Sequence, residues 1–132
     1  MSDVVIDASA LVFALIGKEA DAERLRQRFP NLRRHAPHLA DAEVGNVLRR
    51  HRLAGLIDDA EASAALRAGG ALIHYRYPHV GELAEAAWRL NDNLSFYDAL
   101  YVALAHKLGL PLLTTDARLS RAPGVPCVVE VV

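Results

Sequence analysis

Two short apolar runs near opposite ends of the chain each end in a hydroxyl and a carboxylate. The first, VVIDASAL at residues 4–11, places Asp7 and Ser9 after three β-branched residues, and the second, PLLTTD at residues 111–116, ends in Thr115 and Asp116. Ligands of open parallel sheets bind outside the carboxyl ends of the strands, so both pairs are expected to face a cleft. Helix capping and local turn formation are the structural alternatives for both carboxylates.

Two further carboxylates belong to predicted helices. Glu43 shares a helix face with apolar neighbours, and Asp98 lies in the first turn of the helix that follows Ser95. If Asp7, Glu43, Asp98 and Asp116 met, they would repel one another and hold protons unless a cation compensated them. Oxygen-only ligands favour Mg²⁺ or Mn²⁺ over zinc, and such an ion activates water for attack on a phosphate. The predicted chemistry is phosphodiester hydrolysis.

Each helical carboxylate also has an ordinary structural explanation. The spacing of Ser95 and Asp98 is that of a capping box. Glu43 could pair with Arg49 or Arg50 on the polar edge of its helix. Asn46, one turn after Glu43, either supports that carboxylate by a hydrogen bond or faces solvent.

These side chains require an alternation of strands and helices to position them. Strands are predicted at 4–6, 33–36, up to residue 114 and at 128–132, with an extended segment or loop at 71–75; helices are predicted at 10–16, 21–28, 37–53, from 58 or 59 to 69, 80–90 and 96–108. This alternation favours an α/β fold, a three-layer α/β/α sandwich with a central parallel sheet.

Length and composition bound the class of protein. The 132 residues, 52% of them apolar, predict a single domain over 1–132 with a real hydrophobic core. A single cysteine, Cys127, excludes an intramolecular disulfide and favours a reducing setting. No uncharged apolar run approaches the roughly 18 residues of a membrane helix, and the N-terminus lacks the pattern of a signal peptide. We therefore expect a soluble, cytoplasmic protein that does not interact with membranes.

The net charge of −1 conceals an uneven distribution. Residues 24–52 contain eight arginines and two acidic residues, which gives this segment +6 and the remainder −7. A basic segment beside a carboxylate-rich remainder suits a protein that holds a polyanion near a metal, although solvated ion pairs are the ordinary explanation. The arginines predicted to contact RNA phosphates are Arg33, Arg34, Arg49, Arg50 and Arg118, the last because it follows Asp116 directly.

Other catalytic classes do not match the chain. Its six histidines show no metal-binding spacing, and no glycine loop for phosphate is present. A phosphoacceptor receiver domain needs a lysine near its site, but the only lysines are Lys18 and Lys107. A phosphatase that forms an aspartyl-phosphate needs a second aspartate where Ser9 stands.

Four segments together resemble the motifs of the PIN-domain ribonucleases, and most of all the VapC toxins of prokaryotic toxin–antitoxin pairs. The segments are VVIDASAL at 4–11, AEVGNVL at 42–48, SFYDALYVALA at 95–105 and LTTDARL at 113–119. Their order and spacing carry the resemblance, since each motif alone is weak. The family often has a further acidic residue after the fourth motif, but residues 117–121 contain none.

This resemblance implies a function, a site and partners. It implies an endoribonuclease that depends on Mg²⁺ or Mn²⁺, forms a homodimer and is inhibited by a VapB-type antitoxin. The implied acidic site is Asp7, Glu43, Asp98 and Asp116, with Ser9 and Thr115 as supporting hydroxyls. The alternative is a catalytically silent PIN-fold module that binds RNA or a protein, and four intact carboxylates argue against it, because an anionic pocket without metal would repel RNA.

Overall fold

The chain folds into five strands and seven α-helices that alternate along the sequence. The computed structural model describes residues 1–132. Its elements are β1 (Ser2–Ile6), α1 (Ala8–Ile16), α2 (Ala20–Arg28), the 3-10 helix η1 (Phe29–Asn31), β2 (Leu32–Pro37), α3 (Leu39–Leu53), α4 (Asp59–Gly69), β3 (Tyr75–Tyr77), α5 (Glu82–Trp88), α6 (Phe96–Leu108), β4 (Leu112–Thr114), α7 (Ala117–Arg121) and β5 (Val129–Val131). None of the helices combines the length and the apolar character that crossing a membrane requires.

All five strands lie parallel in one sheet, in the order β3-β2-β1-β4-β5. The chain builds outward from β1 to β2 and β3, then returns to the other side of β1 to form β4 and β5. The order of strands therefore reverses between β1 and β4. In parallel sheets this reversal opens a crevice at the carboxyl ends of the two strands, which is where ligands bind.

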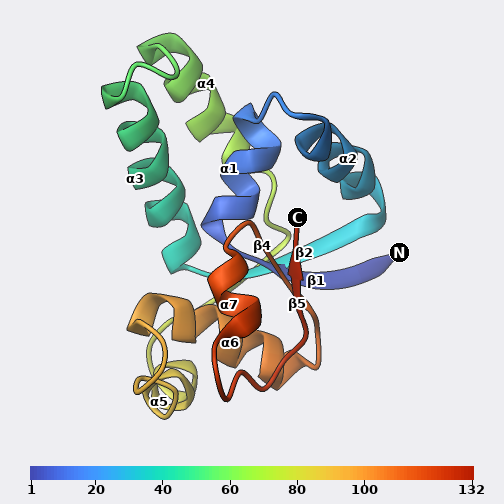
Figure 1. Cartoon of the computed structure of the whole chain (residues 1–132), viewed down its shortest axis with the longest axis vertical. Helices are drawn as coiled ribbons and strands as arrows, with labels where there is room; N and C mark the ends of the chain where they lie inside the picture. The colour runs from blue at the N-terminus through green and yellow to red at the C-terminus, as the bar shows by residue number, and fades with distance from the viewer.

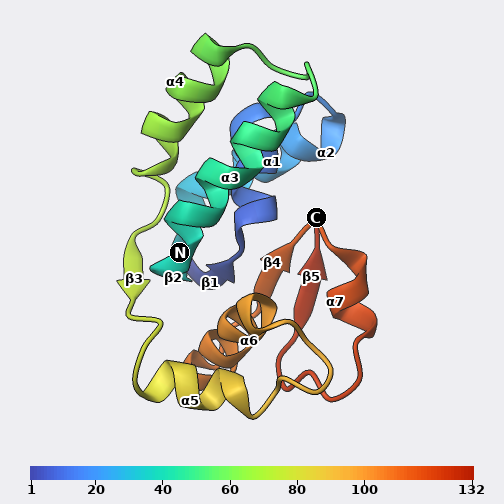
Figure 2. The same cartoon turned by 90° about the vertical axis from the view of Figure 1, so that its left-hand side faces the viewer.

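Helices cover both faces of the sheet. Figures 1 and 2 show α1, α2, α3 and α4 on one face, with α5, α6 and α7 on the other. This division follows from right-handed crossovers, because reversing the direction of strand addition moves the connecting helices to the opposite face. The predicted three-layer α/β/α sandwich with a parallel sheet is confirmed.

The core is centred on β1 and α6. Val4, Val5 and Ile6 are buried, as are all seven consecutive residues from Ala99 to Ala105 in α6. A helix that is apolar on every side can only be an interior helix. Gly109 ends α6 with a positive φ of 66°, a conformation that glycine adopts without strain. Asp98 thus lies at the exposed N-terminal turn of a helix that the core holds in place.

Two local predictions differ from the structure. The third strand occupies Tyr75–Tyr77 rather than 71–75, because these residues pair with β2 through His35, Ala36 and Pro37. Residues Ala117–Arg121 form the short helix α7, where we expected only a turn through Arg118. Both differences depend on tertiary neighbours that local sequence patterns do not contain.

Arg34 is a structural clamp. Its side chain is only 6% exposed and donates hydrogen bonds to three carbonyl oxygens, of Phe29 at 2.6 Å, Leu32 at 3.1 Å and Leu72 at 2.5 Å. The guanidinium also lies over the Phe29 ring, 4.2 Å from its centroid. The prediction that Arg34 contacts RNA is therefore wrong, because its guanidinium N–H groups already donate to carbonyl oxygens inside the protein.

Replacing Arg34 should destabilise the fold. Arg34→Ala removes three largely buried hydrogen bonds and the contact with the Phe29 ring, and we expect urea unfolding to show a loss of about 3 kcal/mol. The matched variant Arg33→Ala, on the neighbouring exposed side chain, should cost clearly less. Equal losses in the two variants would contradict the clamp.

Candidate active site

Asp7 follows the central strand directly and begins α1. Its carboxylate Oδ1 accepts hydrogen bonds from the Ser9 hydroxyl at 2.6 Å and from the Ala10 backbone N–H at 3.0 Å. Its own backbone N–H donates to the Leu113 carbonyl of β4 at 3.1 Å. Asp7 is therefore both the helix cap and a buried carboxylate at the reversal point of the sheet.

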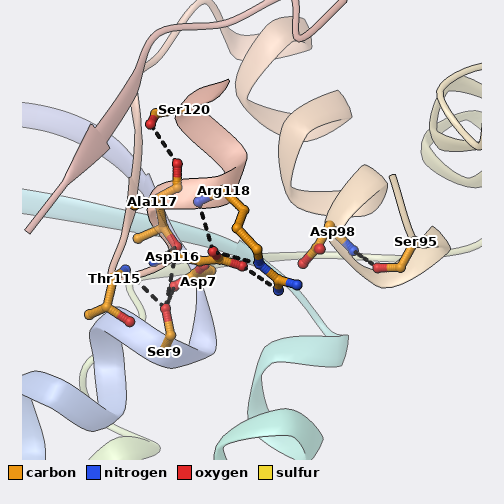
Figure 3. Close-up of polar contacts among 10 residues, drawn as sticks. Asp7, Ser9, Ser95, Asp98, Thr115, Asp116, Ala117, Arg118 and Ser120 are labelled. Atoms are coloured by element: carbon orange, nitrogen blue, oxygen red, sulfur yellow. Dashed lines mark hydrogen bonds and ion pairs between the residues drawn. The ribbon is translucent and has the colours of Figure 1, made fainter. Parts of the chain in front are cut away.

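Ser9 ties the ends of β1 and β4 together. Besides donating to Asp7, its Oγ accepts the Thr115 backbone N–H at 3.1 Å and lies 3.3 Å from the Thr114 hydroxyl. Thr114 is fully buried, and its hydroxyl accepts the Asp116 backbone N–H at 3.0 Å. This network, visible in part in Figure 3, fixes the backbone that presents Asp7 and Asp116. Of the two threonines, Thr114 supplies the hydroxyl, whereas Thr115 takes part through its backbone.

Glu43 reaches the same region from α3. The Tyr101 hydroxyl of α6 donates to its Oε1 at 2.6 Å, and burial raises the pKa of Tyr101 far above its usual value. A neutral donor that cannot ionise at physiological pH therefore holds this carboxylate. Asn46 is exposed and forms no hydrogen bond with Glu43, so the predicted support comes from Tyr101 instead.

Asp98 approaches from the first turn of α6. The Ser95 hydroxyl caps this helix by accepting the Asp98 backbone N–H at 3.1 Å, so the predicted capping role is confirmed for Ser95. The Asp98 carboxylate itself forms no hydrogen bond. Figure 3 shows it pointing toward the loop that carries Asp116. Four separate elements thus direct one carboxylate each toward the same end of the sheet.

Burial and mutual repulsion act on these carboxylates. Burial is the main reason that the pKa values of Asp7, Glu43 and Asp98 are raised. The negative charge of Asp98 raises the pKa of Asp7 further, the charges of Asp7 and Asp98 do the same to Glu43, and that of Asp116 does so to Asp98. The four carboxylates therefore lie near enough for the charge of one to act on the pKa of another.

Asp116 differs from the other three carboxylates because it forms an ion pair with the guanidinium of Arg118. Arg118 donates its backbone N–H and Nε to Oδ1 at 2.9 and 3.1 Å, and its Nη2 to Oδ2 at 2.8 Å. These contacts lower the pKa of Asp116. No other basic side chain forms an ion pair with any of the four carboxylates.

The oxygen donors of the four carboxylates are of the type that a hard dication prefers, although the side chains lie too far apart to coordinate one ion. All four groups are carboxylates, three of them with raised pKa values, and a divalent ion would relieve their repulsion. No three histidine, cysteine, aspartate or glutamate side chains are gathered closely enough to hold an ion as they stand. This spacing is expected of uncompensated like charges, one of which is already paired with Arg118.

An apolar groove of about 590 Å³ adjoins the acidic site. Ser9 and Thr115 form part of its wall, and most of the rest is apolar: Val12, Phe13, Ile16, Val47, Leu56, Ile57 and Val132. His51 also lines it, and the Nδ1 atom of that ring is buried without a hydrogen-bond partner. The groove is therefore continuous with the site through two shared residues.

The remaining predicted arginines divide into two groups. Arg33 pairs with Asp3 at 2.8 and 3.0 Å, near the start of β1 and thus at the opposite end of the strands from Asp7. Arg49 and Arg50 are exposed on α3 without ion-pair partners, and the charge of Arg50 lowers the pKa of Glu43. Of the predicted arginines, Arg50 and Arg118 are the two whose charges act on the four carboxylates, because Arg118 also lowers the pKa values of Asp98 and Asp116.

Sequence reasoning missed two residues of the site. Tyr101 follows Asp98 by three positions, which places both on one face of α6. Thr114 precedes Asp116 by two positions, and the two-residue period of a strand puts it on the opposite side from Thr115. Both spacings were available in the sequence, but neither shows which partner a hydroxyl finds across the fold.

Comparison with known proteins gives consistent matches. The chain matches the PIN domain family over residues 4–125. It is 52% identical to Ribonuclease VapC1 of Mycobacterium tuberculosis over 132 residues, which covers 100% of this chain and 99% of that protein. Among solved structures it resembles PAE2754 from Pyrobaculum aerophilum, at 27% identity and a TM-score of 0.71, covering 98% of this chain and 92% of that one. It also has the fold of VapBC2 from Rickettsia felis bound to a promoter DNA fragment, at 12% identity and a TM-score of 0.71, covering 100% and 99% of the two chains.

Asp7 should reduce the stability of the metal-free protein at neutral pH. Its raised pKa means that the folded state binds more protons than the unfolded state between the ordinary value of 3.8 and the folded value, so stability falls as pH rises through that window. Asp7→Asn keeps the capping oxygen and removes this cost. At pH 7 in EDTA we expect its melting temperature to rise by about 3 °C or more, the shift that roughly 1 kcal/mol produces at this size. The difference should shrink toward pH 4.

Asp3 provides a control in which the expected change in stability is opposite, because its pKa is lowered whereas that of Asp7 is raised. Hydrogen bonds from Arg33 and His35 lower the pKa of Asp3 to about 2, so its charged form stabilises the fold at neutral pH. Asp3→Asn should therefore lower the melting temperature at pH 7. A decrease in both variants would show that Asp7 is an ordinary stabilising cap.

Proposed function

This chain belongs to the PIN-domain family and, within it, to the VapC ribonucleases, and we propose that residues 1–132 form one PIN domain. We propose that this domain is an endoribonuclease. It hydrolyses RNA phosphodiester bonds with Mg²⁺ or Mn²⁺ as its cofactor. In this proposal it is the toxin of a VapBC-type pair. The observation that carries the proposal is geometric: Asp7, Glu43, Asp98 and Asp116 come from four separate elements and are directed toward the carboxyl end of one sheet, where Ser9 and Tyr101 hold two of them.

These four carboxylates are the residues that would hold the metal. When bound, a dication of this kind activates water and neutralises charge on the phosphate that is attacked. The protein's own network prepares the ligands for this task. Ser9 and the Ala10 N–H fix Asp7 at Oδ1, and Tyr101 fixes Glu43 at Oε1 and leaves Oε2 without a hydrogen bond. Asp98 carries no side-chain hydrogen bond and is free to ligate.

The electrostatics of the site require a positive charge before a polyanion can enter. An RNA phosphate approaching the four carboxylates without a metal would meet net repulsion. Exposed arginines reduce this barrier: Arg50 on α3 and Arg118 on α7, whose charges act on Glu43 and Asp116, and Arg49, which is exposed next to Arg50 in the chain. We propose that these three contact the phosphates of the strand, whereas Arg33 and Arg34 serve the fold.

RNA cleavage should depend on the metal and on the carboxylates. With Mn²⁺ and total RNA as substrate, we expect cutting that EDTA abolishes and that falls at least about 100-fold in Asp7→Asn and in Asp98→Asn, because each removes one anionic ligand. The readout is the rate at which fragments appear on a denaturing gel.

Asp92→Asn is the matched control, an exposed aspartate six residues before Asp98 with no hydrogen bond, and it should cleave at the wild-type rate. Cleavage that persists in EDTA would contradict the proposed metal chemistry. RNA binding without cleavage under all conditions would favour the alternative of a catalytically silent binding module.

A VapB-type antitoxin is the proposed protein partner. Structures that share this fold include VapBC-5 of Mycobacterium tuberculosis, a member of the VapBC family of toxin-antitoxin systems. The apolar groove supports the proposal, because an occupant lying in it would contact Ser9 and Thr115 and cover the approach to the carboxylates. We propose that an apolar segment of the antitoxin binds there. A homodimer is also proposed, and exposed aromatic side chains on α5 and α6, Trp88 and Phe96, support it.

Antitoxin binding should be sensitive to charge in the groove. Leu56 is 64% exposed and lines the groove, so Leu56→Asp should fold normally and weaken binding of the proposed VapB-type antitoxin by roughly tenfold or more. Leu66→Asp is the control, since Leu66 is 51% exposed on α4 outside the groove. Calorimetric titration measures the antitoxin affinity of both variants. If both bind the antitoxin as tightly as wild type, the proposal that the antitoxin occupies the groove is contradicted.

A further inference from the structure

Arg118 occupies both oxygens of one proposed metal ligand. Its Nε and Nη2 donate to Oδ1 and Oδ2 of Asp116 at 3.1 and 2.8 Å, the two-pronged arrangement in which a guanidinium matches a carboxylate. Figure 3 shows this guanidinium lying between the carboxylates of Asp116 and Asp98. The positive charge thus stands where the acidic cluster would otherwise gather around an ion.

The pair can separate without displacing Asp116. The Arg118 side chain is 83% exposed, so water can replace its hydrogen bonds at little cost. The carboxylate keeps its position through a different group, because the Arg118 backbone N–H holds Oδ1 at 2.9 Å and Thr114 holds the Asp116 backbone. The side chain of Arg118 can therefore leave Asp116 while the carboxylate stays in place.

We propose that Arg118 exchanges partners during the reaction: it neutralises Asp116 in the metal-free protein, and when a dication binds to Asp116 it releases that carboxylate and binds an RNA phosphate. This inference rests on the proposed metal-dependent ribonuclease. Two cations on one carboxylate repel, so Arg118 and the metal compete for it. The guanidinium fork that fits a carboxylate fits a phosphate equally well, and a metal on Asp116 leaves the fork without its partner.

The exchange predicts that one variant binds Mn²⁺ more tightly and RNA more weakly than wild type. Arg118→Gln removes the competitor, so Mn²⁺ titrated into RNA-free protein should bind about threefold to fivefold more tightly, as measured by calorimetry. The same variant should bind a single-stranded RNA about threefold to tenfold more weakly when Ca²⁺ fills the site in place of Mn²⁺ so that the strand stays intact. Fluorescence anisotropy measures this binding, and in EDTA the variant and wild type should differ by less than twofold.

Arg121→Gln is the matched control. Arg121 lies on the same short helix, is exposed and forms no ion pair, so its loss changes the net charge equally and removes only a weak charge effect on Asp116, without any hydrogen bond to it. Its Mn²⁺ affinity should stay within twofold of wild type. Arg118→Lys keeps the charge but not the fork, and should fall between wild type and Arg118→Gln in both measurements.

The possible results separate this inference from the proposed function. If wild type binds Mn²⁺ and cleaves RNA but Arg118→Gln binds Mn²⁺ no more tightly, the exchange is overturned and the ribonuclease stands. A loss of RNA affinity that is equal in EDTA and in Ca²⁺ would overturn it too, because Arg118 would then be a permanent phosphate contact. If wild type binds no Mn²⁺ at all, both the exchange and the metal-dependent function are overturned.

Discussion

Repulsion among carboxylates at one end of the sheet is the constraint on which the rest of the structure depends. Burial raises the pKa values of Asp7, Glu43 and Asp98, and their charges oppose one another. Such an arrangement opposes folding, so the surrounding structure must supply the stability that maintains it. Hydrogen bonds from Ser9 and Tyr101 hold two of the groups, and Arg118 partly neutralises the fourth carboxylate, Asp116.

The architecture supplies that stability through its most buried elements. β1 lies in the centre of the sheet and ends at Asp7, and the interior helix α6 begins beside Asp98. Both carboxylates are thus attached to the ends of elements whose own positions are fixed by apolar packing. The reversal of strand order between β1 and β4 then brings Asp116 to the same crevice. The site needs no long loop, because each ligand lies within one turn of a strand end or on a helix.

The sequence predicted the layers of the fold, and it located four carboxylates at strand ends and on helix faces, because both depend on local patterns. Apolar runs that end in carboxylates locate strand ends, and three- and four-residue spacings locate helix faces. The supporting contacts were harder to predict, since Tyr101 meets Glu43 across 58 positions of sequence and no local pattern shows that pairing. The sequence pattern suggested Asn46 and the hydroxyl of Thr115 instead, which are neighbours along the chain rather than in space.

The arginines show the same limit. The excess positive charge of residues 24–52 suggested a phosphate-binding surface, but several of these side chains pair locally: Arg24 with Asp21, Arg26 with Glu23, Arg28 with Glu130 and Arg33 with Asp3. Arg34 is buried among carbonyl oxygens, which composition cannot reveal. The clustering of charge in sequence therefore overstated the basic surface, and Arg49 and Arg50 are the two of these arginines that remain exposed without an ion pair.

The central claim is that these carboxylates together bind one hard dication or more, and anomalous diffraction from crystals soaked in Mn²⁺ tests it most directly. The account predicts an anomalous peak about 2.1 Å from carboxylate oxygens of Asp7 and Asp98, with the Arg118 side chain turned away from Asp116. It would be contradicted by an acidic cluster without any such peak at a Mn²⁺ concentration that supports RNA cleavage in solution.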